Sequence, residues 1–340
     1  MPFPNSSSST QRQKWILAGI VAPLVIILVI MLLVVLIPGR KKTPSSQDLD
    51  WKGKGTDKYF QEIILGRCYN YIATKNSELR YALWEHMKWP SRLLHPYSGT
   101  PSQWRSGLLH LCCLSGNRDT DCIKIWELLQ NAFMYKDPCS VTEEDYKPLM
   151  EFASYPVPCN KSLFWSKTND LVHRYTKANS DFLTLEDTLI GYIADGISWC
   201  GKPSSPGVNY KSCPKWTECE SNPSTIYWKM ASKMFAEAAC GTVQVMLNGS
   251  TESDAFRSNS IFGSIEIFNL NPDKVSKVHI WLMHNIDGPQ SESCTGHSIT
   301  KLKKILESRQ IMVSCEDNYR PVQLLQCMNN PDHTTCRICS

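Results

Sequence analysis

The sequence has no acidic residue among its first 42 positions and no cysteine among its first 67. Five Lys and Arg residues lie in the acid-free stretch, so the net charge of +4 is concentrated there. The rest of the chain carries 31 basic and 32 acidic residues, a net charge of −1. A charge balance of this kind gives no argument for nucleic-acid binding.

An uncharged apolar run covers residues 15–37. Its 23 residues are enough to span a bilayer as a helix, and Pro23 is tolerated in a membrane helix. The alternative is a cleaved signal peptide, but the run is long for one and no small-residue cleavage site follows it. We therefore expect an uncleaved transmembrane helix here, after a tail over residues 1–14 and before a stalk over residues 38–56.

All 15 cysteines lie after the expected anchor, at a density typical of oxidising compartments. Two N-glycosylation sequons begin at Asn160 and Asn248, in the same part of the chain. Basic residues flank both ends of the apolar run, so the positive-inside rule does not set the orientation. The cysteines and sequons favour a single-pass type II protein of the plasma membrane, with a cytosolic tail and an extracellular C-terminal part.

Apolar residues recur at helical spacing in much of the first two thirds of the chain. The stretches are residues 58–71, a helix from Asp121 onward, a short helix from Thr142 with Asp145 as its capping partner, residues 161–175 and residues 225–240. Residues 81–118 interrupt this pattern without a period of their own. Their His86, His95, His110, Cys112 and Cys113 fit no zinc-site spacing. We interpret this segment as an inserted loop and expect no metal site.

After Cys240 the period changes from helical to alternating. Strands separated by crossover segments favour a parallel sheet. Short strands are expected at residues 243–247, 265–267, 278–283 and 311–313, with a helix over residues 298–308. The fold class is therefore α+β, with a small, mainly parallel four-stranded sheet. A mostly helical part (residues 57–158 and 184–239) would pack on an α/β part (residues 159–183 and 240–340).

Residues 184–201 carry the signals of one amphipathic helix. Thr184 and Asp187 form a capping pair at its start, and the apolar residues that follow recur at helical spacing. Gly196 marks its expected end. Glu186 and Asp187 lie in the first turn, where acids usually only cap a helix.

Seven motifs follow one another along the chain: residues 138–146 (PCSVTEEDY), 157–161 (VPCNK), 163–166 (LFWS), 184–200, 227–229 (YWK), 235–240 (FAEAAC) and 262–266 (FGSIE). In this order, and with their cysteines, they resemble the ADP-ribosyl cyclase family, whose members cleave NAD at the nicotinamide–ribose bond. The resemblance covers the chain after the stalk, except residues 81–118. An N-terminal apolar run without an apolar C-terminal tail favours the membrane-anchored type II members over the lipid-anchored ones.

Glu266 matches the catalytic glutamate of that family. From the pattern alone, an acid between Ile265 and Ile267 is more often a solvent-facing residue of a strand. The chemistry nevertheless suits a carboxylate, because nicotinamide leaves NAD as a neutral base and needs no general acid. The barrier lies in an oxocarbenium-like ribosyl centre, which a buried carboxylate stabilises or bonds covalently.

The resemblance implies further site residues. Trp165 and Trp228 match an aromatic pair that would stack on the pyridinium, although both also suit an apolar core. Glu186 matches an acid that contacts the nicotinamide and tunes hydrolysis against cyclisation. Asp195 matches a second pocket acid, and in a regular helix it would lie about 180° from Glu186, so the helix must end or bend. Positions near the phosphates and ribose are matched by Ser166, Ser232 and Phe262.

Three positions depart from the family pattern. Lys167 stands where the family commonly has Arg. Lysine still supplies a positive charge, but it cannot form the bidentate hydrogen bonds of a guanidinium. Ile261 lacks a hydroxyl, and Gly196 replaces a common Asp. The family's disulfide pattern implies the pairs Cys68–Cys122, Cys139–Cys219, Cys159–Cys240, Cys200–Cys213, Cys294–Cys315 and Cys327–Cys336. It leaves Cys112, Cys113 and Cys339 without partners.

The expected function is hydrolysis of NAD to ADP-ribose and nicotinamide, with formation and hydrolysis of cyclic ADP-ribose and base exchange on NADP. NAD, NADP and cyclic ADP-ribose would be substrates, and no cofactor or metal would be needed. A homodimer and a cell-surface protein ligand stay open. The alternative is a catalytically silent type II receptor or adhesion ectodomain of the same fold.

Overall fold

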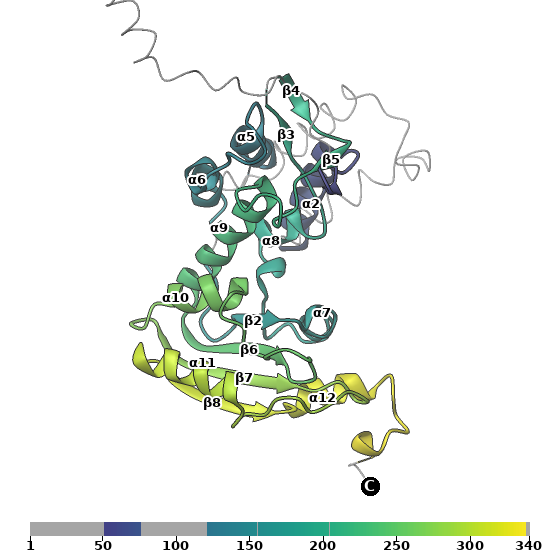
Figure 1. Ribbon diagram of the computed structural model, residues 1–340, viewed down its shortest axis with the longest axis vertical. Helices are drawn as coiled ribbons and strands as arrows, with labels where there is room; N and C mark the ends of the chain where they lie inside the picture. The colour runs from purple at the N-terminus through teal and green to yellow at the C-terminus, as the bar shows by residue number, and fades with distance from the viewer. Residues whose placement is uncertain (1–50, 76–120, 155, 204, 338–340) are drawn as a thin grey trace, which may run out of the picture. The chain divides into compact units, whose positions relative to one another are not determined.

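The computed structural model describes residues 51–75, 121–154, 156–203 and 205–337 (Figure 1). The expected tail, the anchor, most of the stalk and the inserted segment 81–118 lie outside these residues. Within the part of the chain that is described, no helix combines the length and apolarity needed to cross a bilayer. The described residues belong to one compact unit.

Four of the expected helices are confirmed, with shifted ends. They are α2 (Phe60–Lys75), α5 (Cys122–Phe133), α6 (Glu143–Phe152) and α9 (Pro223–Ala238). Local capping explains where two of them begin. The Asp121 carboxylate accepts hydrogen bonds from two backbone N–H groups of α5, and Thr142 with Asp145 forms the expected capping box of α6.

The four-stranded sheet is parallel throughout, in the order β2-β6-β7-β8. Its strands are β2 (Leu163–Ser166), β6 (Gly241–Asn248), β7 (Val275–Met283) and β8 (Met312–Asp317). Three strands and the helix α11 (His297–Ser308) are where the sequence predicts them. The fourth is not: residues 265–267 are helical, and β2 takes the edge position.

The expectation of a helix over residues 161–175 is therefore wrong in its first half. Residues 163–166 form β2, and α7 (Asn169–Ala178) begins after it. Leu163 packs with α7 on one face of the sheet, whereas Phe164 packs on the other. A four-residue strand that is buried on both faces has no alternation, so its apolar run resembles part of a helix.

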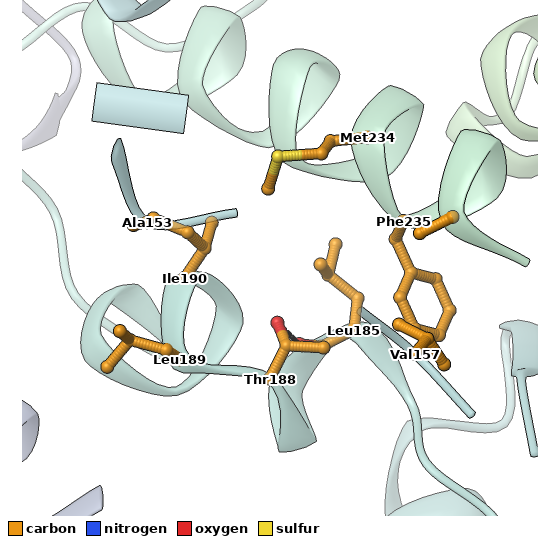
Figure 2. A pocket seen from close by; sticks show the side chains of 9 residues that line it. Ala153, Val157, Leu185, Thr188, Leu189, Ile190, Met234 and Phe235 are labelled. Atoms are coloured by element: carbon orange, nitrogen blue, oxygen red, sulfur yellow. Dashed lines mark hydrogen bonds between the residues drawn. The ribbon is translucent and has the colours of Figure 1, made fainter. Parts of the chain in front are cut away.

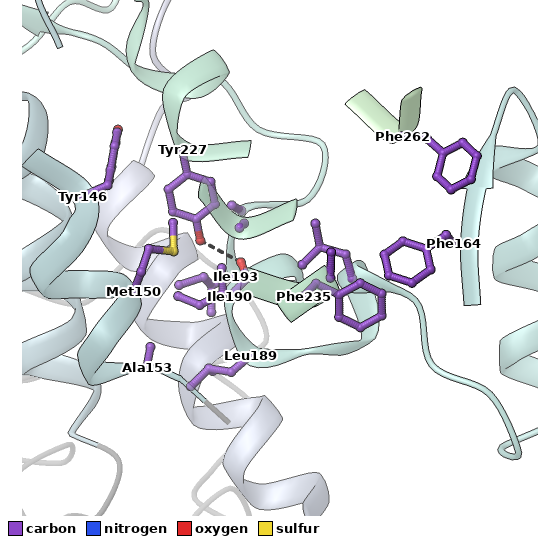
Figure 3. Packing of buried hydrophobic residues seen from close by; sticks show 14 of the residues in the cluster. Tyr146, Met150, Ala153, Phe164, Leu189, Ile190, Ile193, Tyr227, Phe235 and Phe262 are labelled. Atoms are coloured by element: carbon purple, nitrogen blue, oxygen red, sulfur yellow. Dashed lines mark hydrogen bonds between the residues drawn. The ribbon is translucent and has the colours of Figure 1, made fainter. Parts of the chain in front are cut away.

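Helices cover both faces of the sheet (Figure 1). The aromatic cluster of Trp281 and Tyr175 lies under α7 and α12 (Arg320–Cys327), and the opposite face contacts α11 and α9. One apolar core continues from that face into the helices, where Tyr227 donates a hydrogen bond to the Ile190 carbonyl over 2.7 Å (Figure 3). The division into two subdomains remains a prediction.

Two short antiparallel strand pairs were not expected from the sequence. β1 (Gly53–Lys54) pairs with β5 (Ser212–Cys213), and β3 (Gly201–Lys202) pairs with β4 (Ser205–Val208). Strands of two to four residues leave too little pattern to recognise.

The described residues contain six disulfides, which join the six pairs that the resemblance implies. Two of them tie the elements around the site together. Cys68–Cys122 links α2 to α5, and Cys159–Cys240 links the segment before β2 to the start of β6.

Candidate active site

The segment after Thr184 is two short helical turns, so the expectation of a single helix is wrong. A 3-10 turn, η1 (Leu185–Asp187), is followed by α8 (Leu189–Ala194). Thr188 separates them: its hydroxyl donates to the Leu185 carbonyl and accepts the Gly191 N–H. A Cβ on Gly191 would lie 2.0 Å from the Leu185 carbonyl oxygen, so the break needs glycine at this position.

Because of this break, Glu186 lies on a separate turn from α8. The predicted capping box of Thr184 and Asp187 is present, and the Asp187 carboxylate accepts hydrogen bonds from the Thr184 backbone N–H (2.9 Å) and hydroxyl (3.0 Å). Glu186 is not used in capping. Its Oε2 instead accepts a hydrogen bond from Nε1 of Trp165 on β2, at 3.2 Å. Both side chains are half-buried, and the Trp165 ring also packs edge-on against His173, with centroids 5.7 Å apart.

Glu266 lies on a helix and is buried, which corrects the expectation of a strand. A π-turn, η2 (Phe262–Glu266), continues into α10 (Ile267–Asn269), and the Glu266 side chain is 7% exposed. Gly263 allows this turn to approach the preceding loop, because a Cβ there would lie 2.2 Å from the Arg257 carbonyl oxygen. A π-turn is a rare element that often occurs at functional sites.

The environment of Glu266 changes its acidity. The pKa of its carboxyl group is raised to about 8: burial raises it most, a hydrogen bond from Ser232 on α9 lowers it, and the negative charge of Glu186 raises it. Ser232 is itself buried. Four elements thus bring together one acid of raised pKa, a second acid, a hydroxyl and an indole. Perturbed pKa values of this kind cluster at catalytic sites.

Two further aromatic residues have different surroundings. Phe262 is buried between Phe164 and Phe256, with ring centroids 6.3 and 6.2 Å away, so it supports η2 from within the core. Trp228 is half-buried and precedes Ser232 by one turn of α9, so the two share a helix face.

The remaining expected residues lie at the ends of elements. Asp195 is exposed at the end of α8, where Arg67 donates to its backbone carbonyl at 2.6 Å and Gly196 has φ +66°. Ser166 ends β2 and is buried, and Lys167 follows it with φ +58°. Within the described residues, no hydrogen bond that we find connects these side chains to Glu266.

Comparisons with known proteins find relatives of this chain. A family model described as ADP-ribosyl cyclase matches residues 109–336. The rat protein ADP-ribosyl cyclase/cyclic ADP-ribose hydrolase 1 is 45% identical over 291 residues, which cover 85% of this chain and 83% of the relative. The human protein ADP-ribosyl cyclase/cyclic ADP-ribose hydrolase 2 is 34% identical over 288 residues, covering 85% and 78%.

The chain belongs to the ADP-ribosyl cyclase family. Solved structures of similar fold include porcine CD38 with a covalent intermediate, ribo-F-ribose-5'-phosphate. It is 42% identical, with a TM-score of 0.64, over 79% of this chain and all of that chain. Aplysia cyclase with the substrate NGD and the product cGDPR is 29% identical, with a TM-score of 0.67, over 83% of this chain and 98% of that chain.

One residue that supports the site of this cyclase-family chain is not identified by sequence reasoning. Arg309, just after α11, donates hydrogen bonds to the carbonyls of Phe268 (2.9 Å) and Leu270 (2.7 Å). These carbonyls end the helix that carries Glu266. A basic residue after a predicted helix is common, so nothing in the sequence distinguishes Arg309.

A small apolar cavity of ≈ 20 Å³ lies behind the turn that carries Glu186 (Figure 2). Leu185 and Thr188 line it together with Met234 and Phe235 of α9. Trp165 and Glu266 are not among its lining residues. Its volume is enough for about one water molecule, so it is no substrate pocket.

Proposed function

We propose that this chain is an ecto-NAD glycohydrolase and ADP-ribosyl cyclase. It cleaves the nicotinamide–ribose bond of NAD to give nicotinamide with ADP-ribose or cyclic ADP-ribose. It also hydrolyses cyclic ADP-ribose and exchanges the base of NADP. The observation that carries the proposal is the buried Glu266, held beside Ser232 and under the influence of the Glu186 charge. The named relatives support it, as does the structure of Aplysia cyclase with the substrate NGD and the product cGDPR.

Binding of the substrate prepares the carboxylate. With a pKa of about 8, Glu266 is mostly protonated in the free enzyme at neutral pH. The nicotinamide ring of NAD carries a positive charge, and a cation nearby favours the ionised form of a carboxyl group. Trp165 and Trp228 supply aromatic faces on which this flat cation stacks. The substrate therefore helps to ionise the group that attacks it.

Cleavage then needs no proton. The bond between ribose C1′ and the ring nitrogen breaks, and its electron pair neutralises the pyridinium, so nicotinamide leaves as a neutral base. The ionised Glu266 stabilises the positive ribosyl carbon or bonds to it. A related protein, porcine CD38, has a structure with a covalent intermediate. Since the leaving group is neutral, the proposal needs no metal and no further cofactor.

The second step decides the product. Water gives ADP-ribose, adenine N1 of the same molecule gives cyclic ADP-ribose, and another base gives the exchange product. Glu186 lies near enough to influence the charge of Glu266 and is fixed by Trp165. We propose that Glu186 accepts the proton that an attacking water molecule releases. It would thereby control the balance between hydrolysis and cyclisation.

The location is proposed from the sequence. Residues 15–37 anchor the chain as a type II protein of the plasma membrane, with the catalytic part outside the cell. Asn160, exposed at the surface, and Asn248 carry N-linked glycans. A homodimer and a cell-surface protein ligand remain predictions without assigned residues.

The test is nicotinamide release from NAD by the purified protein and by two variants. Glu266→Gln keeps the shape of the side chain and should reduce release at least about a hundredfold. Glu237→Gln, an exposed acid on the same helix as Ser232, should release nicotinamide like the parent. Equal release by Glu266→Gln would refute its role. A parent without activity would favour a silent receptor, unless deletion of residues 81–118 restores release.

A further inference from the structure

The Trp165 indole has a second polar neighbour that the catalytic proposal does not use. Its N–H donates to Glu186, and its ring packs edge-on against His173 of α7, with ring centroids 5.7 Å apart and ring planes inclined by 75°. The hydrogen bond fixes one atom of the indole. The contact with His173 acts on the ring itself, so the two contacts together set both the position and the tilt of the indole.

Trp165 needs support from outside the sheet because β2 is an edge strand. It is paired with Met246 of β6, which flanks β2 on one side. Further support comes from α7, which lies over the same face of the sheet. On this helix Val172 is fully buried, and Arg174 donates a hydrogen bond to a backbone carbonyl of α12 at 3.3 Å. These contacts anchor the turn of α7 that carries His173.

One ring nitrogen of His173 has no ordinary partner. Its Nε2 atom is buried, and within the described residues it forms no hydrogen bond. A buried polar atom without a partner is costly, so it needs an explanation in a native protein. Two rings inclined by 75° place the edge of one against the face of the other, and an N–H group can donate to an aromatic face. The face of Trp165 is therefore a partner that suits an Nε2–H group.

We propose that His173 is a positioning residue for NAD cleavage, because the Nε2–H edge of its ring contacts the face of Trp165 and holds the indole in place. The proposal rests on the function proposed above. His173 acts through Trp165: a fixed indole presents its N–H to Glu186, whose charge acts on Glu266. Trp165 is half-buried, so part of its ring remains available for the nicotinamide to stack on.

The kinetic test begins with His173→Ala, which removes the ring and keeps a residue that favours a helix. We expect KM for NAD to rise and the ratio of cyclic ADP-ribose to ADP-ribose to change, each by about two- to tenfold, the range that an edge-to-face ring contact supplies. The value of kcat should change less than about twofold, because Glu266 and Ser232 are unaltered. Lys177→Ala, exposed one turn further along α7, should match the parent in all three quantities.

Two further variants separate positioning from a general effect on the fold. His173→Phe keeps a ring edge, whose hydrogens carry a partial positive charge, so its KM and product ratio should lie closer to the parent than to His173→Ala. In Trp165→Phe the donor to Glu186 is already gone, so adding His173→Ala should change the product ratio by less than about 1.5-fold. Independent effects of the two substitutions on this ratio would overturn the proposal, as would a His173→Phe variant as impaired as His173→Ala.

A spectroscopic measurement tests the contact without relying on catalysis. The 11 tryptophans of the full chain are labelled as 5-fluorotryptophan, and Trp165→Phe and Trp216→Phe identify the ¹⁹F resonances of these two residues. Trp216 is 66% exposed and serves as the reference. His173→Ala should displace the Trp165 resonance and leave that of Trp216 in place, because the imidazole ring adjoins only the former indole. A Trp165 resonance that does not move would overturn the proposal.

The outcomes distinguish failure of this inference from failure of the proposed function. A parent that releases no nicotinamide from NAD refutes the proposed function and, with it, the role of His173 in that reaction, while the Trp165 resonance still shows whether the contact exists. A parent that cleaves NAD, together with a His173→Ala variant of unchanged KM and product ratio, refutes the role of His173 alone.

Discussion

The indole N–H of Trp165 donates to the Glu186 carboxylate over 3.2 Å, and that carboxylate raises the pKa of Glu266. The edge strand of the sheet thereby fixes one acid, which in turn adjusts the acidity of the other. The interaction connects β2, η1 and η2, three elements that are separate in the sequence. Each of the predictions below alters one part of this arrangement.

Removal of the indole N–H should change the products more than the rate. Trp165→Phe keeps an aromatic face for the nicotinamide but leaves Glu186 without its donor. We expect the ratio of cyclic ADP-ribose to ADP-ribose to change about threefold or more, while NAD cleavage falls less than about tenfold. Chromatography of the products from NAD measures both. An unaltered ratio, with Trp216→Phe as the control, would contradict the role of this hydrogen bond.

The pH profile should report the ionisation of Glu266. The reaction needs the carboxylate, so kcat/KM for NAD should rise about tenfold per pH unit below pH 7 and level off above about pH 8. Glu186→Gln removes a negative charge that raises the pKa of Glu266, so its plateau should begin at lower pH. Initial rates at low NAD concentration measure both profiles. A plateau at the same pH in parent and variant would refute the electrostatic coupling.

Burial of Glu266 should cost stability in a defined pH window. Its pKa is about 8 in the folded protein, against 4.5 for an ordinary glutamate in the unfolded chain, so between these pH values the folded state keeps a proton that the unfolded state releases. Stability therefore falls as pH rises through this window. Between these pH values, the free energy of unfolding of Glu266→Gln relative to the parent should therefore rise by about 1 kcal/mol per pH unit. Denaturant midpoints at several pH values, with Glu237→Gln as control, test this; a pH-independent difference would contradict it.

Arg309 should act on the reaction through the helix that it caps. Arg309→Lys keeps the charge but cannot bridge the carbonyls of Phe268 and Leu270 as a guanidinium does. We expect kcat to fall about tenfold with little change in KM, because a displaced Glu266 binds NAD but stabilises the ribosyl centre less well. If the pH profile of Arg309→Lys also shifts relative to that of the parent, this would support a positioning role for Arg309. Equal kcat in parent and variant would exclude it.

The break before α8 offers a steric test. Gly191→Ala places a methyl group 2.0 Å from the Leu185 carbonyl oxygen, so η1 or α8 must move. We expect the free energy of unfolding to fall by more than about 2 kcal/mol and most of the NAD-cleaving activity to be lost. Gly66→Ala is the matched control, because a Cβ there meets nothing within 4 Å on α2 and should stabilise the helix by about 0.5–1 kcal/mol. Similar stability of the two variants would contradict the steric argument.

Features set by neighbouring residues could be predicted from the sequence. The capping pairs of Thr142 and Thr184 need only a partner three residues away, and both are present. The strands β6 and β7 are long enough to show their pattern. The pairing of the cysteines came from the family resemblance, because no spacing rule selects one connectivity among many.

Features set by distant contacts could not be predicted. Ile265 and Ile267 alternate like a strand, but the buried turn that contains them depends on a glycine approaching Arg257 and on packing against α9. The acidity of Glu266 depends on Ser232, which is 34 residues earlier, and on Glu186, which is 80 residues earlier. The break at Thr188 follows from one close contact of Gly191. Residue periodicity contains none of this information.

The position of β2 at the edge of the sheet has a consequence during synthesis. β2 ends at Ser166, but its partner β6 begins at Gly241, about 75 residues later. At ribosomal rates of about 5–20 residues per second, the strand waits on the order of 4–15 seconds with its hydrogen-bonding edge open. Cys159 also waits for Cys240, after Cys112 and Cys113 have already emerged. We therefore expect correct oxidation of this chain to depend on the timing of translation as well as on the stability of the finished fold.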